Sequence, residues 1–410
     1  METEAYPRWV LLARYGEEED EHEYPGVTGD DKTVAACFTY AGHPIRFSLR
    51  IAAPPATSCL WVHSPEGRIW SDPCVIASHG NALLVQIETR VRRSRSDFTV
   101  LHFVYSAGDR RSSRPPSLRL LPHCNFIVQN IRRSFCTEDA PAPRGFFIEK
   151  LSDHHATPRL LDRNATGILR RGKDAFVVAE LQMAPSEYRK PAAELLLLRS
   201  GRWSVKRALI THGGDKCREL SSWRTDSVVS VGDRFLCWID LSRGVMFADV
   251  LDDSPVLRYV SFPLKHRCYT EPKRSQNVCA TAAGMVKLVE ICTSHRCGCW
   301  GTRCPHSCYP CTVESWTLRM DDMGWVMDGT VNVTDLWALD KWQGLPRVEL
   351  ECPVVSVDDP NVICFLVCES EQHYEKQWMV MVDMRSKTVQ SVCRCPNFSI
   401  HVITAKGLTL

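Results

Sequence analysis

A short phrase recurs five times along this chain: one or two turn residues followed by an uninterrupted apolar strand. The copies are Gly80-Asn81 before residues 82–87, Lys173-Asp174 before 175–181, Gly232-Asp233 before 235–239, Gly284 before 285–291, and Pro360-Asn361 before 362–368. Self-similarity at a spacing of a few tens of residues marks a repeat architecture. The repeated phrase therefore constrains the fold more than any other feature of the sequence.

Most copies continue into a second hairpin. Residues 195–198 lead through a turn at 199–202 into 203–205, and residues 316–319 lead through 321–324 into 325–327. Gly, Asp, Asn, Ser and Pro occupy the turns, and β-branched and aromatic residues fill the strands. The apolar strand, which we expect to be the innermost of each unit, must be covered on both faces. Neighbouring blades of a β-propeller provide that cover.

The sequence thus predicts an all-β fold, a degenerate β-propeller of about five to six antiparallel blades with long loops. Counted from Gly80 through Gly172, Gly232 and Gly284 to Pro360, the turn signals are 92, 60, 52 and 76 residues apart, whereas regular propeller repeats span about 40–50 residues. The longest interval leaves room for a worn sixth blade near residues 125–131 and 146–150, and strands near the N-terminus are candidates to close the ring. A pair of antiparallel sandwiches is the alternative.

Three segments are expected along the chain. Residues 1–32 hold an N-terminal strand and an acidic loop, residues 33–226 the N-terminal half of the propeller, and residues 227–410 its C-terminal half. The chain has 50 basic and 48 acidic residues among its 410, a formal charge of +2. That balance argues against a dedicated nucleic-acid or membrane-surface protein.

The N-terminal residues show no secretory signal, and no window approaches the ~18 apolar residues of a membrane helix. We therefore expect a protein of the cytoplasm or nucleus that is not secreted and does not contact a membrane. Twenty cysteines would indicate disulfides in a secreted chain, but free thiols are the expectation in a reducing compartment.

Six cysteines and two histidines fall between the strands expected at 286–291 and 313–318. These candidate zinc ligands are Cys292, His295, Cys297, Cys299, Cys304, His306, Cys308 and Cys311. Zinc takes four such ligands, usually from closely spaced pairs, and the flanking strands bring the ends of this loop together. The spacing matches no standard zinc finger, so the alternatives are a closed structural zinc site and a metal-free, thiol-rich loop.

Other charged groups are expected to be structural. The arginine runs at 90–95 and 110–114 lie at opposite ends of a predicted strand pair, so they form solvated loops and not one nucleic-acid patch. The acid pairs Asp252-Asp253, Asp321-Asp322 and Asp358-Asp359 lie in predicted turns, where Asp bonds the local backbone. No phosphate loop, dinucleotide fingerprint, nucleophile elbow or zinc-protease helix is present. No catalytic or cofactor-binding residue is predicted.

Several stretches resemble a known family. They are residues 231–244 with 247–251, Trp316-Thr317-Leu318 with Trp325, residues 336–340, Gly344-Leu345-Pro346, and Asp358-Asp359-Pro360. Together they resemble the plant family, abundant in grasses, that carries domain of unknown function 1618, with its core at about 238–375. The resemblance covers essentially the whole chain and is densest from 227 to 368. It implies no established activity, substrate or catalytic residue.

The repeats and the lack of catalytic motifs predict a non-enzymatic interaction or scaffold protein. Its partner would be another protein, bound through loops on a rigid framework. One alternative is an enzyme or small-molecule binder that uses the central channel of the propeller, because fold does not determine function. A second alternative is a zinc-stabilised loop that contacts protein or nucleic acid.

Overall fold

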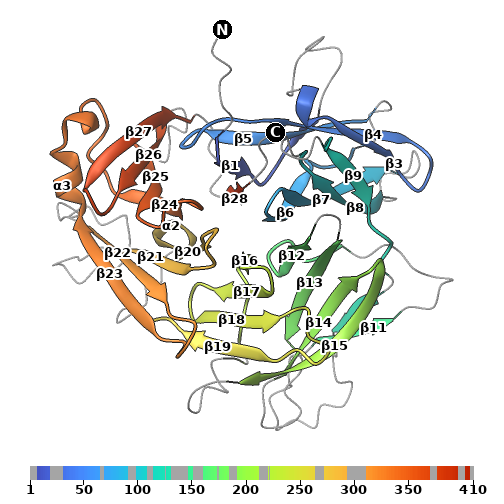
Figure 1. Ribbon diagram of the computed structural model, residues 1–410. Coiled ribbons are helices and arrows are strands. Elements are labelled where there is room, and N and C mark those ends of the chain that lie inside the picture. The colour runs from blue at the N-terminus through green and yellow to red at the C-terminus, as the bar shows by residue number, and fades with distance from the viewer. Residues whose placement is uncertain are drawn as a thin grey trace, which may run out of the picture. The chain divides into compact units, whose positions relative to one another are not determined.

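The computed structural model of the chain, drawn in Figure 1, contains two compact units. It describes residues 7–18, 31–64, 69–90, 98–108, 114–124, 126–130, 146–150, 160–172, 175–183, 192–211, 220, 222–263, 272–292, 311–369, 376–395 and 402–406. Unit 1 comprises Met1–Arg14, Arg50–Cys59 and Phe262–Leu410, and unit 2 comprises Tyr15–Leu49 and Leu60–Ser261. Both are built from β-sheets, which confirms the all-β prediction.

Five four-stranded antiparallel meanders form most of the described structure. Unit 2 holds three of them. The first is β6 (Cys74–His79), β7 (Ala82–Arg90), β8 (Phe98–Ser106) and β9 (Ser117–Leu120). The second is β12 (Thr166–Arg171), β13 (Ala175–Met183), β14 (Ala192–Arg199) and β15 (Arg202–Thr211). The third is β16 (Ser227–Val231), β17 (Phe235–Asp240), β18 (Gly244–Asp249) and β19 (Leu257–Ser261).

Unit 1 holds the other two meanders. One is β20 (Gln276–Ala280), β21 (Val286–Cys292), β22 (Thr312–Leu318) and β23 (Trp325–Asn332). The other is β24 (Leu350–Val355), β25 (Val362–Cys368), β26 (Gln377–Asp383) and β27 (Thr388–Arg394). The short helices α3 (Val333–Trp337) and η3 (Asp340–Trp342) connect the two, and α2 (Pro272–Ser275) precedes β20.

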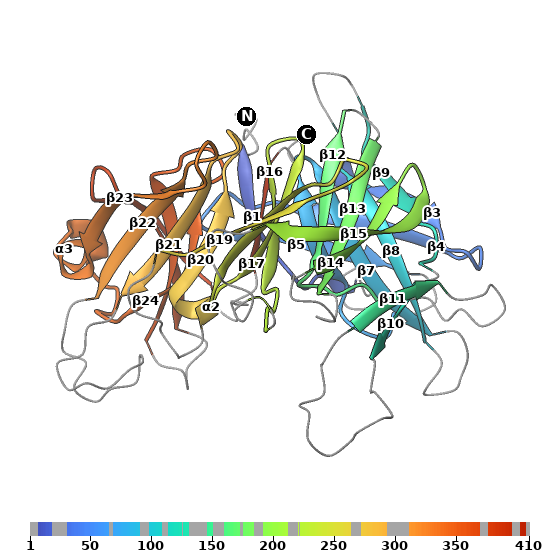
Figure 2. The ribbon, with the colours of Figure 1, turned by 90° about the horizontal axis from the view of Figure 1, so that it is seen from below.

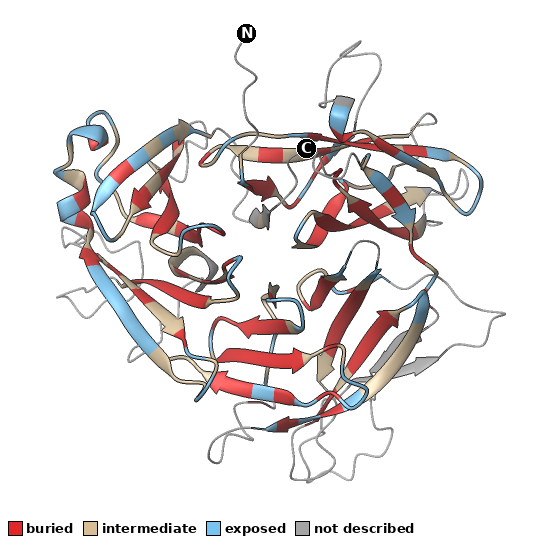
Figure 3. Cartoon of the chain, in the orientation of Figure 1, coloured by how far each residue is buried: buried red, intermediate tan, exposed pale blue. Residues whose placement is uncertain are grey.

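The apolar strand of the repeated phrase is the second strand of each meander, so each meander begins one strand earlier than the phrase predicted. These second strands are β7, β13, β17, β21 and β25. Each pairs with a strand on both sides and is largely buried (Figure 3), which explains its unbroken apolar sequence. The strand before it is harder to recognise because it is short and, as in β16 and β20, mixes polar with apolar residues.

Two meanders of unit 2 join into one eight-stranded, barrel-like sheet that is nearly closed. The last strand of each meander joins the two, because β15 and β19 pair in parallel over two residues at the middle of the sheet. Its first strands also lie side by side, because the Ser230 hydroxyl on β16 donates to the carbonyl of Ile168 on β12 at 2.7 Å. The core between them includes Trp238, whose Nε1 donates to the Ala165 carbonyl at 2.8 Å. Figure 2 shows this sheet beside β7 and β8 of the first meander.

The remaining strands of unit 2 lie outside these meanders. The strands β3 (Ala35–Phe38) and β4 (Pro44–Arg50) make an antiparallel hairpin, and β2 (Glu17–Glu18) pairs with the second half of β5 (Thr57–His63). The strands β3, β4 and β5 are neighbours in one sheet. The short helix η1 (Asp31–Thr33) precedes β3. Where the sequence predicted a worn blade, β10 (Phe126–Asn130) and β11 (Phe146–Lys150) form a two-stranded hairpin.

The two ends of the chain meet in unit 1. The strand β1 (Trp9–Ala13) pairs antiparallel with β28 (Val402–Lys406) over five residues, and its Leu11 and Leu12 pair in parallel with the start of β5. Trp9 and Leu11 pack in a core with residues of β24, β25 and β26. None of the helices in the described part of the chain has the length and apolarity needed to cross a membrane.

Candidate functional site

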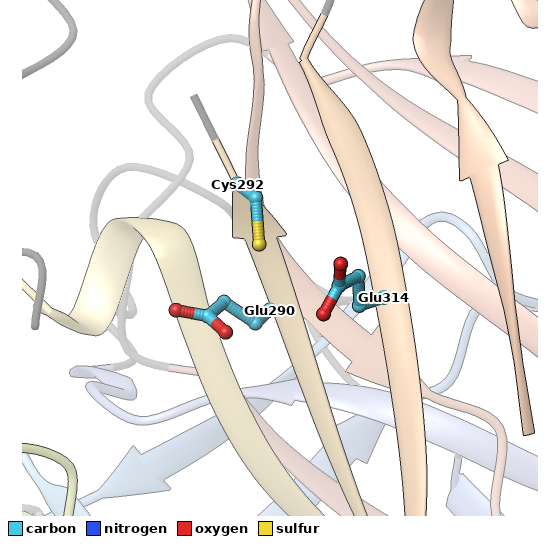
Figure 4. A group of neighbouring side chains, drawn as sticks. All are labelled: Glu290, Cys292 and Glu314. Atoms are coloured by element: carbon cyan, nitrogen blue, oxygen red, sulfur yellow. The ribbon is translucent and has the colours of Figure 1, made fainter. Parts of the chain in front are cut away.

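Three side chains with metal-ligating atoms meet on one face of the sheet β20–β23 in unit 1 (Figure 4). Glu290 and Cys292 lie two residues apart on β21, so they share a face. Glu314 on β22 is directly opposite Glu290 in the antiparallel register. One ligand atom from each of the three lies within 4.8 Å of the others. We call these three residues the ligand cluster.

The electrostatics of the ligand cluster favour a bound proton or cation. Glu290 is only 8% exposed, and burial raises its pKa to about 7. A hydrogen bond with Cys292 lowers the pKa, whereas the charge of Glu314 raises it further. Like charges directly opposite each other destabilise a strand pair. Among the side chains that the structure describes, no Lys or Arg forms an ion pair with either glutamate.

The two predicted zinc ligands at the ends of the loop lie on opposite faces of the sheet. Cys292 pairs with Thr312 and joins the ligand cluster. Cys311, the residue before Thr312, is 2% exposed and packs in the apolar core with Val289 and Val313. Burial raises the pKa of the Cys311 thiol to about 11. His295, Cys297, Cys299, Cys304, His306 and Cys308 lie outside the described residues.

The donor set of the ligand cluster suits a borderline metal ion. Carboxylate oxygen and thiolate sulfur are both ligands of Zn²⁺, whereas Mg²⁺ and Ca²⁺ prefer oxygen alone. A buried glutamate that must ionise to bind would gain from a divalent ion, because the ion neutralises two facing carboxylates at once. Of the three residues in the ligand cluster, only Cys292 was predicted from the sequence as a metal ligand, and the two glutamates were not.

Other buried ionisable groups in the described structure hold strands and turns together. Asp240 is 1% exposed; it accepts hydrogen bonds from the backbone of Arg224 and Ser242 and pairs with Arg243 at 2.8 Å. Glu180 accepts from the Gln182 side chain at 2.7 Å. These carboxylates are therefore engaged by the fold.

The acid pairs serve as turn formers, as predicted. The Asp252 carboxylate accepts from the backbone N–H of Ser254, and the Asp359 carboxylate accepts from that of Asn361. Asp322 accepts from the Gly324 N–H at 3.0 Å and pairs with Arg319. Each backbone bond spans two residues, the geometry in which Asp fixes a local turn.

Residues 238–364 match the model of the family described as "Protein of unknown function (DUF1618)". The match confirms the family resemblance seen in the sequence, and the matched segment runs from β17 into β25. The plant origin that the resemblance implies stays an expectation. No curated protein matches this chain.

Three solved structures illustrate the distant similarity of this chain to known folds. A hypothetical selenium-binding protein from Sulfolobus tokodaii is 11% identical, with 71% of this chain and 73% of that one covered and a TM-score of 0.27. Sqt1 from Chaetomium thermophilum, solved with the N-terminus of ribosomal protein L10, is 9% identical over 78% and 73%, with a TM-score of 0.31. The arabinofuranosidase PaAbf62A from Podospora anserina is 8% identical over 88% and 91%, with a TM-score of 0.28.

Proposed function

We propose that this protein is a non-enzymatic scaffold that binds another protein, and that its four-stranded meanders are blades of a β-propeller. Two features support the proposal. The second strand of each meander is apolar and buried on both faces, as blades stacked on each other require. The acid pairs and the buried carboxylates Glu180 and Asp240 are engaged in turns and strand contacts. Binding would then fall to the loops, which vary on a rigid framework.

The observation that carries the proposal is the position of the ligand cluster. Its three side chains lie where β21 ends and β22 begins, at the root of the connection that joins them. A zinc ion bound by Glu290, Cys292 and Glu314 would fix the two strands at that point and remove the repulsion between the glutamates. Its role would be structural, to hold a loop in place for a partner.

Metal content tests this role. We expect purified full-length protein to contain about one zinc per chain by elemental mass spectrometry, and the Cys292→Ser and Glu314→Gln variants to lose it. Cys368→Ser is the matched control, because Cys368 ends β25 as Cys292 ends β21 and is likewise half-buried. Chelator should lower the melting temperature of the wild type and not of Cys292→Ser. Zinc near zero in the wild type, or equal in wild type and Cys292→Ser, would contradict the proposal.

Partner capture tests the scaffold itself. Full-length protein used as bait should retain the same protein, near equal stoichiometry, from independent extracts of the native tissue. If no partner recurs, the scaffold proposal fails even where zinc is present.

A metal-dependent enzyme is the second candidate, and one observation favours it. The ligand cluster supplies three protein ligands, the number found in catalytic zinc sites that keep a fourth position for water. Replacement of zinc by Co²⁺ distinguishes a structural zinc site from a catalytic one. In a closed structural site, added azide should leave the visible absorption band of Co²⁺ unchanged. In an open catalytic site, azide would bind the Co²⁺ ion and shift that band.

A further inference from the structure

A small pocket in unit 2 is lined by three arginines. It lies where β8, β9, β12 and β13 approach each other, and its polar lining consists of Arg114, Arg119, Arg170, Ser106 and Ser117. Alanine, valine, proline and phenylalanine complete the wall. Among the residues that the structure describes, the lining therefore holds three arginines and no carboxylate. We call it the arginine pocket.

Strand register explains why these side chains converge. Ser106 on β8 is opposite Ser117 on β9, and Arg119 lies two residues farther along β9 on the same face. On the neighbouring sheet, Arg170 of β12 is opposite Phe176 of β13. One cross-strand group from each sheet thus forms each side of the pocket.

Contacts with the surrounding structure orient two of the arginines. The guanidinium of Arg119 lies 5.6 Å from the ring centroid of Phe176, a cation–π distance. Arg170 donates its Nε–H to the Gly172 carbonyl at 3.2 Å, and its backbone N–H donates to Nδ1 of His79 at 2.8 Å. Arginines held in this way are preorganised, so a ligand bears less of the entropy cost of ordering them.

The size of the pocket limits its ligand. The space open to water is about 30 Å³, roughly twice the ~10–15 Å³ that one water needs. A tetrahedral oxyanion suits this space, whereas a nucleotide base would not enter it. Guanidinium groups bind phosphate oxygens in a bidentate manner, and serine hydroxyls add neutral donors.

We propose that the arginine pocket binds the phosphoryl group of a phosphorylated serine or threonine in the partner protein. Clusters of arginine are a recurring means of recognising phosphorylated segments. Nucleic acid is disfavoured because its binding draws on many phosphate contacts along a basic surface, and this chain has a formal charge of only +2. The proposal rests on the scaffold function and specifies what the scaffold recognises.

The first experiment uses O-phosphoserine and a degenerate phosphopeptide library with its unphosphorylated counterpart. The full-length protein should bind O-phosphoserine and retain phosphorylated peptides in preference to unphosphorylated ones. Arg119→Gln should weaken phosphopeptide binding about tenfold or more, since a hydrogen bond to a charged group contributes about 1.5–3 kcal/mol. Arg202→Gln, at an exposed arginine of β15, is the matched control and should bind as the wild type does.

Four outcomes would overturn the proposal. One is equal retention of both peptide libraries, and another is equal binding by wild type and Arg119→Gln when circular dichroism shows both folded. The third is a single-stranded oligonucleotide that binds more tightly than any phosphopeptide and depends on Arg119. If Arg119→Gln still captures the protein partner as well as the wild type, the pocket assignment fails while the scaffold function stands.

Discussion

His79 joins three meanders of unit 2 through one imidazole ring. It ends β6, and its Nδ1 accepts the backbone N–H of Arg170 on β12 at 2.8 Å. The ring also bonds the backbone of Gly232, in the turn between β16 and β17. An Nδ1 that accepts a hydrogen bond carries no proton, so this arrangement requires neutral histidine.

Acidification should therefore loosen unit 2. Burial lowers the pKa of His79 below 6.5, opposed by its bond to Gly232, while the nearby charges of Arg170 and Asp233 lower and raise it respectively. Because the unfolded chain binds this proton more tightly, the stability from His79 is present above pH 6.5 and is lost as pH falls toward the folded pKa. Denaturant unfolding at pH 7.5 and 5.5 should show a smaller pH effect in His79→Gln than in the wild type. Equal pH effects would contradict this assignment.

Single residues also show what the sequence could reveal of the ligand cluster. Cys292 was recognisable because it begins a thiol-rich stretch. Glu290 and Glu314 look like ordinary polar positions in strands, and nothing about either alone indicates a site. The signal lies in their pairing, because strands expected at 286–291 and 313–318 place 290 opposite 314 if they form an antiparallel pair. The register of this strand pair, and not the residue types, would have identified the two glutamates as neighbours.

At the scale of elements, the repeated phrase identified turns correctly where the structure describes them, and Lys173-Asp174 lies outside the described residues. Gly80, Gly172, Gly232 and Gly284 all have positive φ, between 58° and 78°. Such values are unfavourable for residues with a Cβ. The order of strands was less accessible, since first strands such as β16 and β20 mix polar with apolar residues and leave no unbroken apolar run. An apolar run shows that a strand is covered, but not which strand lies on either side of it.

Backbone conformation at these turns should have a measurable effect on stability. Gly232 has a φ of 60°, and no atom lies within 4 Å of the point that a Cβ would occupy, so Gly232→Ala adds strain without a clash. We expect it to lower the free energy of unfolding by about 1–2 kcal/mol, as measured by denaturant titration. Gly329→Ala is the control, because Gly329 on β23 has equal space and no positive φ. If Gly329→Ala lowers the free energy of unfolding as much as Gly232→Ala does, the positive φ of Gly232 is not the cause of the destabilisation.

At the scale of the whole molecule, the sequence predicted the number of repeats, which is five. It did not predict which segments of the chain make up each compact unit. Each repeat is local in sequence, so its hairpins leave a signal in nearby residues. Unit 1 instead combines residues from both ends of the chain, and the pairing of β1 with β28 joins positions almost 400 residues apart. No local pattern specifies a partner at that distance, because loop-closure entropy and long-range register decide it.

The pairing of the chain ends should control the stability of unit 1. A chain that stops after residue 401 lacks β28, so β1 keeps only its two-residue parallel pairing with β5. If β1 detaches, Trp9 and Leu11 leave their core, and each buried side chain of this kind contributes roughly 1.5–3 kcal/mol. Thermal unfolding should then begin at a lower temperature, with an early change in tryptophan fluorescence. A chain that stops after Lys406 retains β28 and should unfold as the full-length protein does. Identical unfolding of the two truncated chains would show that β28 does not hold β1 in place.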